Sequence, residues 1–170
     1  MASKKKDTHE VVQHFGDLIK GIKVAMMTTV EEDGSLRSRP MWTHDRDFDG
    51  ELWFFTREHA PKVDEVQRDQ HISLTYSEPA RDRYVSVSGT AKVVTDKEKM
   101  RQLWDPSLKA WFPKGLEDPD MALLCVDVTQ AEYWDTPNAR MLQVVGFVKA
   151  VLTGQPLRPG DHEKVNLGKH

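Results

Sequence analysis

Cysteine is almost absent from this 170-residue chain, which contains only Cys125. One cysteine cannot form an internal disulfide, and its place in the apolar run 122–126 predicts a buried, unreactive thiol. No apolar run reaches membrane-spanning length, and the lysines at 4–6 are followed by polar residues, not by the hydrophobic stretch of a secretory signal. We therefore expect a cytoplasmic protein with a disordered basic tail at 1–7 and a single domain at 8–170.

The chain also lacks a strong charge of either sign and any spacing typical of a metal site. Its net charge is −3 with an isoelectric point near 6.2, whereas a nucleic-acid-binding face needs a basic excess. The seven histidines are not paired with cysteine or carboxylate at zinc-binding spacings, and there is no glycine-rich phosphate loop. We expect no nucleic acid, no membrane and no metal among its partners.

Hydrophobic periodicity predicts a mainly β chain with flanking helices. Apolar residues recur at helical spacing near both ends, and alternating or continuous apolar runs fill the middle. The predicted helices are 8–21, 61–67, 96–104 and 141–152; the predicted strands are 24–30, 36–43, 52–56, 71–76, 84–94 and 122–128, with 133–134 closing the sheet and a polar tail at 155–170.

Turn signals set the expected connections between these elements. Asp-Gly pairs at 33–34 and 49–50 predict hairpin turns, so the first three strands should form a meander. Gly89 predicts a β-bulge, and Thr95 with Glu98 has the spacing of a helix capping box. The whole pattern favours a six-stranded antiparallel barrel that is closed or nearly closed.

Two predicted strands and a helix start carry the residues of a candidate anion site. Arg37 and Arg39 share one face of a strand, Thr56 ends the next strand, and Lys62 begins a helix after Pro61. Guanidinium, hydroxyl and ammonium groups together suit a phosphate dianion, and the neighbouring aromatic side chains suit a flat ring. This is the composition of an FMN pocket, although a solvated basic edge and a surface lysine explain the cations equally simply.

Several motifs in a fixed order make the chain similar to a known family. They are the stretches 39–41, 55–56 with Lys62, 84–89, 103–104 with 111–113, and 132–135. Over roughly residues 8–165 the chain resembles the pyridoxamine 5'-phosphate oxidase-like FMN-binding split barrels, and most closely their general stress protein branch.

The resemblance implies that FMN binds at a homodimer interface. It places the phosphate against Arg39, Thr56 and Lys62, and the edge of the isoalloxazine ring along Pro40, Met41 and Trp42, with Phe55 preceding the threonine. Trp134 matches a tryptophan that approaches the flavin from the partner subunit; a plain core or interface aromatic is the alternative. A deazaflavin such as F420, or FAD, remains an alternative cofactor. The abundant tryptophan and phenylalanine also fit an interface.

One departure from the family pattern concerns the reaction. The segment 137–142 retains Arg140 but lacks the histidine that the oxidases place there, so vitamin B6 oxidation is not expected. We expect either a flavin-dependent oxidoreductase that accepts a hydride from a reduced nicotinamide, or a non-catalytic flavin store or sensor. Arg140 could bind an anionic substrate or be an exposed helix arginine; no catalytic residue is predicted.

Overall fold

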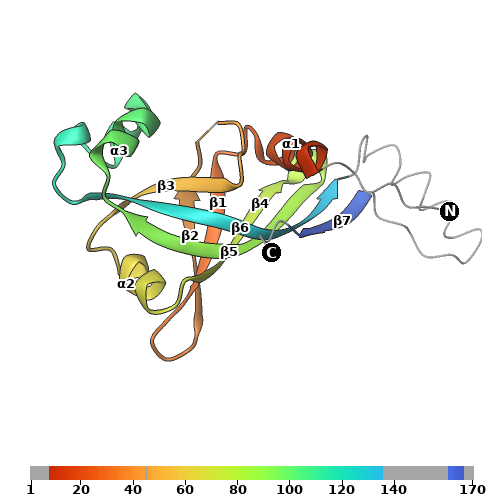
Figure 1. The fold of residues 1–170 in the computed structure, drawn as a ribbon, viewed down its shortest axis with the longest axis horizontal. Helices are drawn as coiled ribbons and strands as arrows, with labels where there is room; N and C mark the ends of the chain where they lie inside the picture. The colour runs from red at the N-terminus through yellow and green to blue at the C-terminus, as the bar shows by residue number, and fades with distance from the viewer. Residues whose placement is uncertain (1–7, 45, 136–160, 167–170) are drawn as a thin grey trace, which may run out of the picture.

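A computed structural model describes residues 8–44, 46–135 and 161–166 (Figure 1). The described elements follow one another as α1 Thr8–Ile19, β1 Val24–Val30, β2 Leu36–Trp42, β3 Glu51–Arg57, α2 Pro61–Arg68, β4 His71–Glu78, η1 Pro79–Arg81, β5 Arg83–Val94, α3 Lys97–Leu103, η2 Pro106–Ala110, η3 Gly115–Glu117, β6 Met121–Asp135 and β7 Asp161–Asn166, where η marks a short 3-10 helix.

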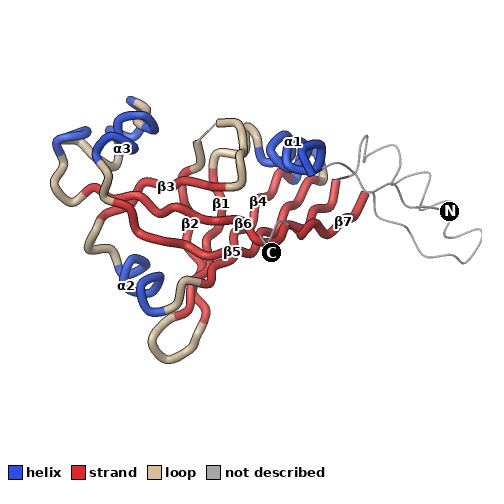
Figure 2. The backbone as a smooth tube through the Cα atoms, viewed as in Figure 1, coloured by secondary structure: helices blue, strands red, loops and turns tan. Residues whose placement is uncertain are grey.

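The strands form one antiparallel sheet that curls on itself, with helices around it (Figures 1 and 2). The strand order is β2-β1-β4-β5-β6-β3, and β7 pairs with the C-terminal half of β6. The prediction of a mainly β, six-stranded antiparallel split barrel with flanking helices is confirmed. The seventh strand lies where we expected only a polar tail, and the predicted helix 141–152 lies outside the described residues.

The predicted meander of the first three strands is wrong at its third strand. β3 pairs with residues 121–127 of β6, at the opposite end of the sheet from β2. Phe54, Phe55 and Thr56 are all buried, so β3 has no solvent face in that stretch and suits a neighbour that is buried in the same way. The first half of β6 is such a strand, whereas β2 is mostly exposed.

The predicted turns, bulge and helix cap agree better with the structure, with two corrections. The turn at Gly34 is present with φ +83°, and β5 shifts register between Ser88 and Gly89 as the bulge required. A Cβ at Gly89 would lie 2.3 Å from the carbonyl oxygen of Asp127, so the two strands approach too closely for any larger residue. However, β6 runs unbroken over 15 residues where we expected two strands.

The second correction concerns the start of α3. Its N-cap is Asp96, whose carboxylate accepts hydrogen bonds from the backbone of Glu98 and Lys99. Thr95 lies one residue outside the helix, so the capping-box prediction was displaced by one position. An aspartate directly before the first helical residue is as good an acceptor as threonine, and here it is the one in position.

Two apolar clusters fill the described structure. The larger lies inside the curled sheet and under α1, and the smaller lies between β3, β6 and the segment 100–112. Cys125 is fully buried, and burial raises the pKa of its thiol to about 12, as expected for an inert core cysteine. Within the described residues, no helix has the length and apolarity needed to cross a membrane.

Candidate functional site

A pocket with a cavity volume of about 250 Å³ opens where the two ends of the curled sheet approach each other. The ends of β2 and β3, the start of α2 and the 3-10 helix η2 form its walls. Six of the nine predicted cofactor residues line it. Its lining consists of Pro40, Met41, Trp42, Phe55, Thr56, Arg57, Ala60, Lys62, Leu108, Trp111 and Phe112.

Part of the pocket lining is polar and positive. Thr56 is buried, and the hydrogen bond that its hydroxyl donates, to the carbonyl of Arg57, is long at 3.5 Å. Lys62 lies in the first turn of α2 after Pro61, near the positive end of the helix dipole. Among the described residues, no carboxylate comes within ion-pair distance of the Lys62 ammonium group. This part of the lining therefore offers a hydroxyl and a cation to an anionic ligand.

The electrostatics of Lys62 agree with that interpretation. Burial lowers the pKa of Lys62, the positive charge of Arg39 lowers it further, and the negative charge of Glu65 acts in the opposite sense. A cation that is both desolvated and close to a second cation is unfavourable without a counter-ion. An anion bound beside Lys62 would relieve both costs.

Another part of the pocket lining is aromatic. The rings of Trp42 and Trp111 lie 5.0 Å apart, and Phe55 lies 6.2 Å from Phe112. Arg57 fastens this wall, since its guanidinium donates to the carbonyl of Trp111 at 2.8 Å and lies 5.2 Å from the Phe112 ring centre. A flat ring can be received between such side chains.

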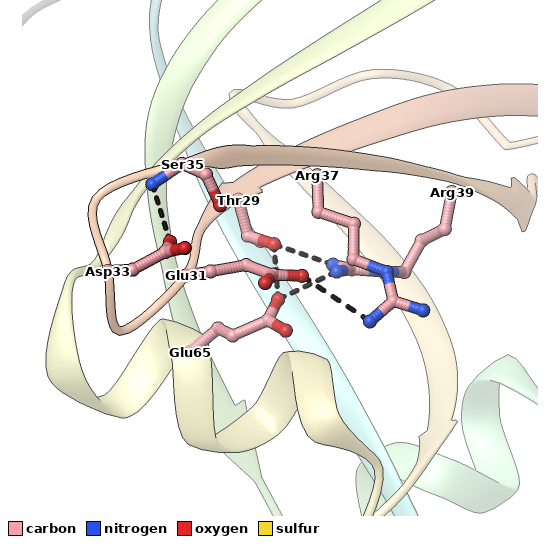
Figure 3. A network of polar contacts seen from close by, with 7 residues as sticks. All are labelled: Thr29, Glu31, Asp33, Ser35, Arg37, Arg39 and Glu65. Atoms are coloured by element: carbon pink, nitrogen blue, oxygen red, sulfur yellow. Dashed lines mark hydrogen bonds and ion pairs between the residues drawn. The ribbon is translucent and has the colours of Figure 1, made fainter.

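Arg37 and Arg39 do not line the pocket, and each has a carboxylate partner (Figure 3). Arg39 donates through Nη2 to Oε2 of Glu65 at 2.7 Å and through Nη1 to Oγ1 of Thr29 at 2.6 Å. Thr29 in turn donates to Oε2 of Glu65 at 2.5 Å. Arg37 is exposed and meets Glu31 at 3.3 Å. The phosphate role predicted for these arginines stays a prediction.

Two further predicted residues are not in this pocket. Trp134 lies near the end of β6, paired with Tyr84 of β5, and is not part of the pocket wall of its own chain. Arg140 lies outside the described residues. Among the described residues, no cluster of histidine, cysteine, aspartate and glutamate could hold a metal ion.

Sequence reasoning missed the wall formed by Arg57, Leu108, Trp111 and Phe112. The aromatic pair at 111–112 belongs to a family motif, but no signal in the sequence indicated that it folds over the end of β3. His44 was also missed. Its ring meets Phe55 edge-on at 5.4 Å, behind the pocket wall, and burial lowers its pKa.

Comparison with known proteins identifies the family and the fold of the chain. The family described as "Pyridoxamine 5'-phosphate oxidase like" matches residues 10–158. Protein bli-3 of Neurospora crassa is 33% identical over 144 residues, which cover 79% of this chain and 69% of that protein. Among solved structures, a protein described as general stress protein 26 from Jannaschia sp. CCS1 superimposes with a TM-score of 0.75 at 24% identity, covering 94% of this chain and 99% of the other, and therefore shares the fold. The general stress FMN/FAD binding protein of Xanthomonas citri is 28% identical with a TM-score of 0.64, covering 75% of this chain and 89% of its own.

Proposed function

The chain belongs to the pyridoxamine 5'-phosphate oxidase-like family, and on this premise we propose that it binds a flavin, FMN in the first instance, in the pocket between β2, β3 and α2. The observation that carries the proposal is that one pocket combines Lys62, a cation with no carboxylate partner among the described residues, with the buried hydroxyl of Thr56 and with aromatic side chains. Those groups fit a phosphate joined to a flat ring.

The polar and the aromatic parts of the lining would have separate tasks. Lys62 and Thr56 would hold the phosphate, while Pro40, Met41, Trp42 and Phe55 would border the ring and exclude water from it. A bound flavin supplies hydride and electron transfer, and the protein supplies binding and orientation. FMN is favoured because its single phosphate matches one polar part of the lining, and FAD or a deazaflavin F420 is the alternative. The Xanthomonas citri relative is described as binding FMN or FAD.

Two functions are compatible with a bound flavin. The first is an oxidoreductase in which a reduced nicotinamide donates a hydride to the flavin and a small acceptor takes the electrons. The second is a non-catalytic flavin store or stress-response module. The pocket lining described above contains no histidine, aspartate or glutamate that could serve as an acid or base, and this favours the second candidate. Rapid reoxidation of the reduced flavin by a small acceptor, faster than by air, would favour the first.

We further propose a homodimer with the cofactor at the subunit interface. Trp134 is not part of its own chain's pocket, so a contact between Trp134 and the flavin needs a second copy of the chain. Three large apolar side chains on the sheet, Val24, Met26 and Tyr84, are also about 40% exposed, as suits a surface that meets a partner. A monomer by analytical ultracentrifugation, with flavin bound, would refute this arrangement.

The cofactor proposal is tested by the absorbance spectrum of the protein after incubation with FMN and desalting. We expect oxidised-flavin bands in the parent protein and their loss in Lys62→Met. Lys97→Met, on the exposed start of α3, is the matched control and should retain flavin. A parent protein that keeps no flavin would overturn the proposal.

A further inference from the structure

The buried group formed by Thr29, Arg39 and Glu65 joins three elements beside the proposed phosphate site (Figure 3). Thr29 comes from β1, Arg39 from β2 and Glu65 from α2. The exposed fractions are 1% for Thr29, 16% for the Arg39 side chain and 5% for the Glu65 side chain. Each member contacts both of the others, so the guanidinium is held from two sides by groups that themselves are bonded together.

This group also balances charge next to Lys62. Arg39 lies close enough to Lys62 for the two charges to repel, and Glu65 acts on Lys62 in the opposite sense. Arg39, Glu65 and Lys62 together carry one net positive charge. Two neighbouring cations with a single carboxylate near them are stabilised by a bound anion, which supplies the missing negative charge.

Arg39 keeps hydrogen-bonding capacity after meeting its partners. A guanidinium has five N–H donors, and the bonds to Thr29 and Glu65 use one on each terminal nitrogen. The two bonds fix the plane of the group, which a lone arginine side chain with four rotatable bonds would not hold without a loss of entropy.

We propose that Thr29 and Glu65 are positioning residues that hold Arg39 beside Lys62, so that these two cations favour a flavin carrying a phosphate over one without it. The inference rests on the proposed function, because it concerns how the same pocket distinguishes FMN from riboflavin. Neither Thr29 nor Glu65 needs to touch the ligand. Their effect is to make the position of the guanidinium independent of ligand binding.

The simpler alternative is that the group only ties α2 to the sheet. In that case, weakening it would loosen FMN and riboflavin equally or would lower stability alone. The ratio of the two flavin affinities separates these readings, because riboflavin presents the same ring without the phosphate. This ratio is a readout that a merely structural role would leave unchanged.

The test compares Thr29→Val with Thr28→Val, which is the same change one residue earlier on β1, where the hydroxyl meets exposed Ser38. Thr29→Val removes a hydroxyl that bonds to both Arg39 and Glu65 and leaves every charge in place. We expect the FMN-to-riboflavin affinity ratio, from flavin fluorescence titration, to fall about tenfold in Thr29→Val, as for the loss of one hydrogen bond to a charged group. It should stay at the parent value in Thr28→Val.

Two more variants keep the test decisive if Thr29→Val folds poorly. Thr29→Ser retains the hydroxyl and should restore most of the ratio, while Glu65→Gln should lower it by loosening Arg39. A rise in FMN affinity in Glu65→Gln would overturn the positioning role, because it would show that the carboxylate acts only by opposing the phosphate charge.

The outcomes also separate this inference from the proposed function. If the parent binds neither flavin, the proposed function fails and this inference with it. If the parent prefers FMN but Thr29→Val keeps the parent ratio, the cofactor proposal stands and the positioning inference is wrong. If Thr29→Val weakens the binding of FMN and riboflavin equally, the positioning inference is also wrong.

Discussion

Replacing Glu65 with leucine should destabilise the protein more than any change to the exposed charges nearby. The substitution removes the carboxylate that Arg39 and Thr29 both contact, and among the described residues the guanidinium, only 16% exposed, has no other counter-charge. Removing one partner of a buried ion pair costs about 3–5 kcal/mol. Because natural domains are stable by only about 5–15 kcal/mol, this is a large share of the total.

The neighbouring pair supplies an internal control. Arg37 and Glu31 lie on the same hairpin, but their side chains are 59% and 33% exposed and 3.3 Å apart. An exposed pair of this kind contributes about 0–1 kcal/mol. Arg37→Met should therefore leave stability almost unchanged, although it removes the same kind of charge two residues away from Arg39.

The assay is urea unfolding followed by tryptophan fluorescence, supported by calorimetry. At about 2–4 °C per kcal/mol for a domain of this size, Glu65→Leu should lower Tm by roughly 6–20 °C. The double variant Arg39→Met, Glu65→Leu should recover most of the loss, because no buried charge then remains unpaired. A loss below about 1 kcal/mol in Glu65→Leu, or equal losses for both pairs, would refute the reasoning.

The same pair should make stability depend on pH in the acid range. Burial by itself raises the pKa of Glu65, but hydrogen bonds from Thr29 and Arg39 and the charge of Arg39 outweigh it and lower the pKa below its ordinary 4.5. The unfolded chain therefore takes up this proton first as pH falls. The ionised Glu65 carboxylate therefore adds fully to the free energy of unfolding above about pH 4.5, and this stabilisation is lost as pH drops through the folded-state pKa. The pH dependence should be missing in Glu65→Leu.

Three further predictions concern the pocket, a helix start and the core. FMN affinity should fall as pH rises through the pKa of Lys62, which burial and the charge of Arg39 hold below its ordinary 10.5; riboflavin titrations should show no such dependence, and an equal dependence would contradict the phosphate site. Asp96→Ala should cost about 1 kcal/mol in urea unfolding through the lost cap of α3, and Thr95→Ala much less; the reverse order would show that the capping assignment is wrong. Cys125 should resist thiol reagents in the folded protein, since it is fully buried and its pKa is raised to about 12, and should react only on unfolding; rapid labelling under native conditions would disprove its burial.

Local features of the fold could be predicted from the sequence, because they depend on neighbouring residues. Alternating and helical patterns predicted most strands and helices to within a few residues, and Asp-Gly and Gly89 marked a turn and a bulge that the structure contains. Six residues on two strands and a helix were predicted to share one site, and they line one pocket. Such signals are local, because backbone geometry and side-chain periodicity act within a few positions.

Contacts between distant parts of the chain could not be predicted from the sequence and are seen in the folded structure alone. β3 pairs with β6 and not with β2. A strand that is buried on both faces can pair with any strand that is equally buried, and the fold places β6 beside it. Arg39 bonds to Glu65, which lies 26 positions further along the chain, and Arg57 donates a hydrogen bond to the carbonyl of Trp111, 54 positions further along. The sequence shows that a buried charge needs a partner, but the partner depends on which residues lie close in space. Arg39 pairs with Glu65 and Thr29, and it therefore lies in a network beside the pocket and not in the pocket wall.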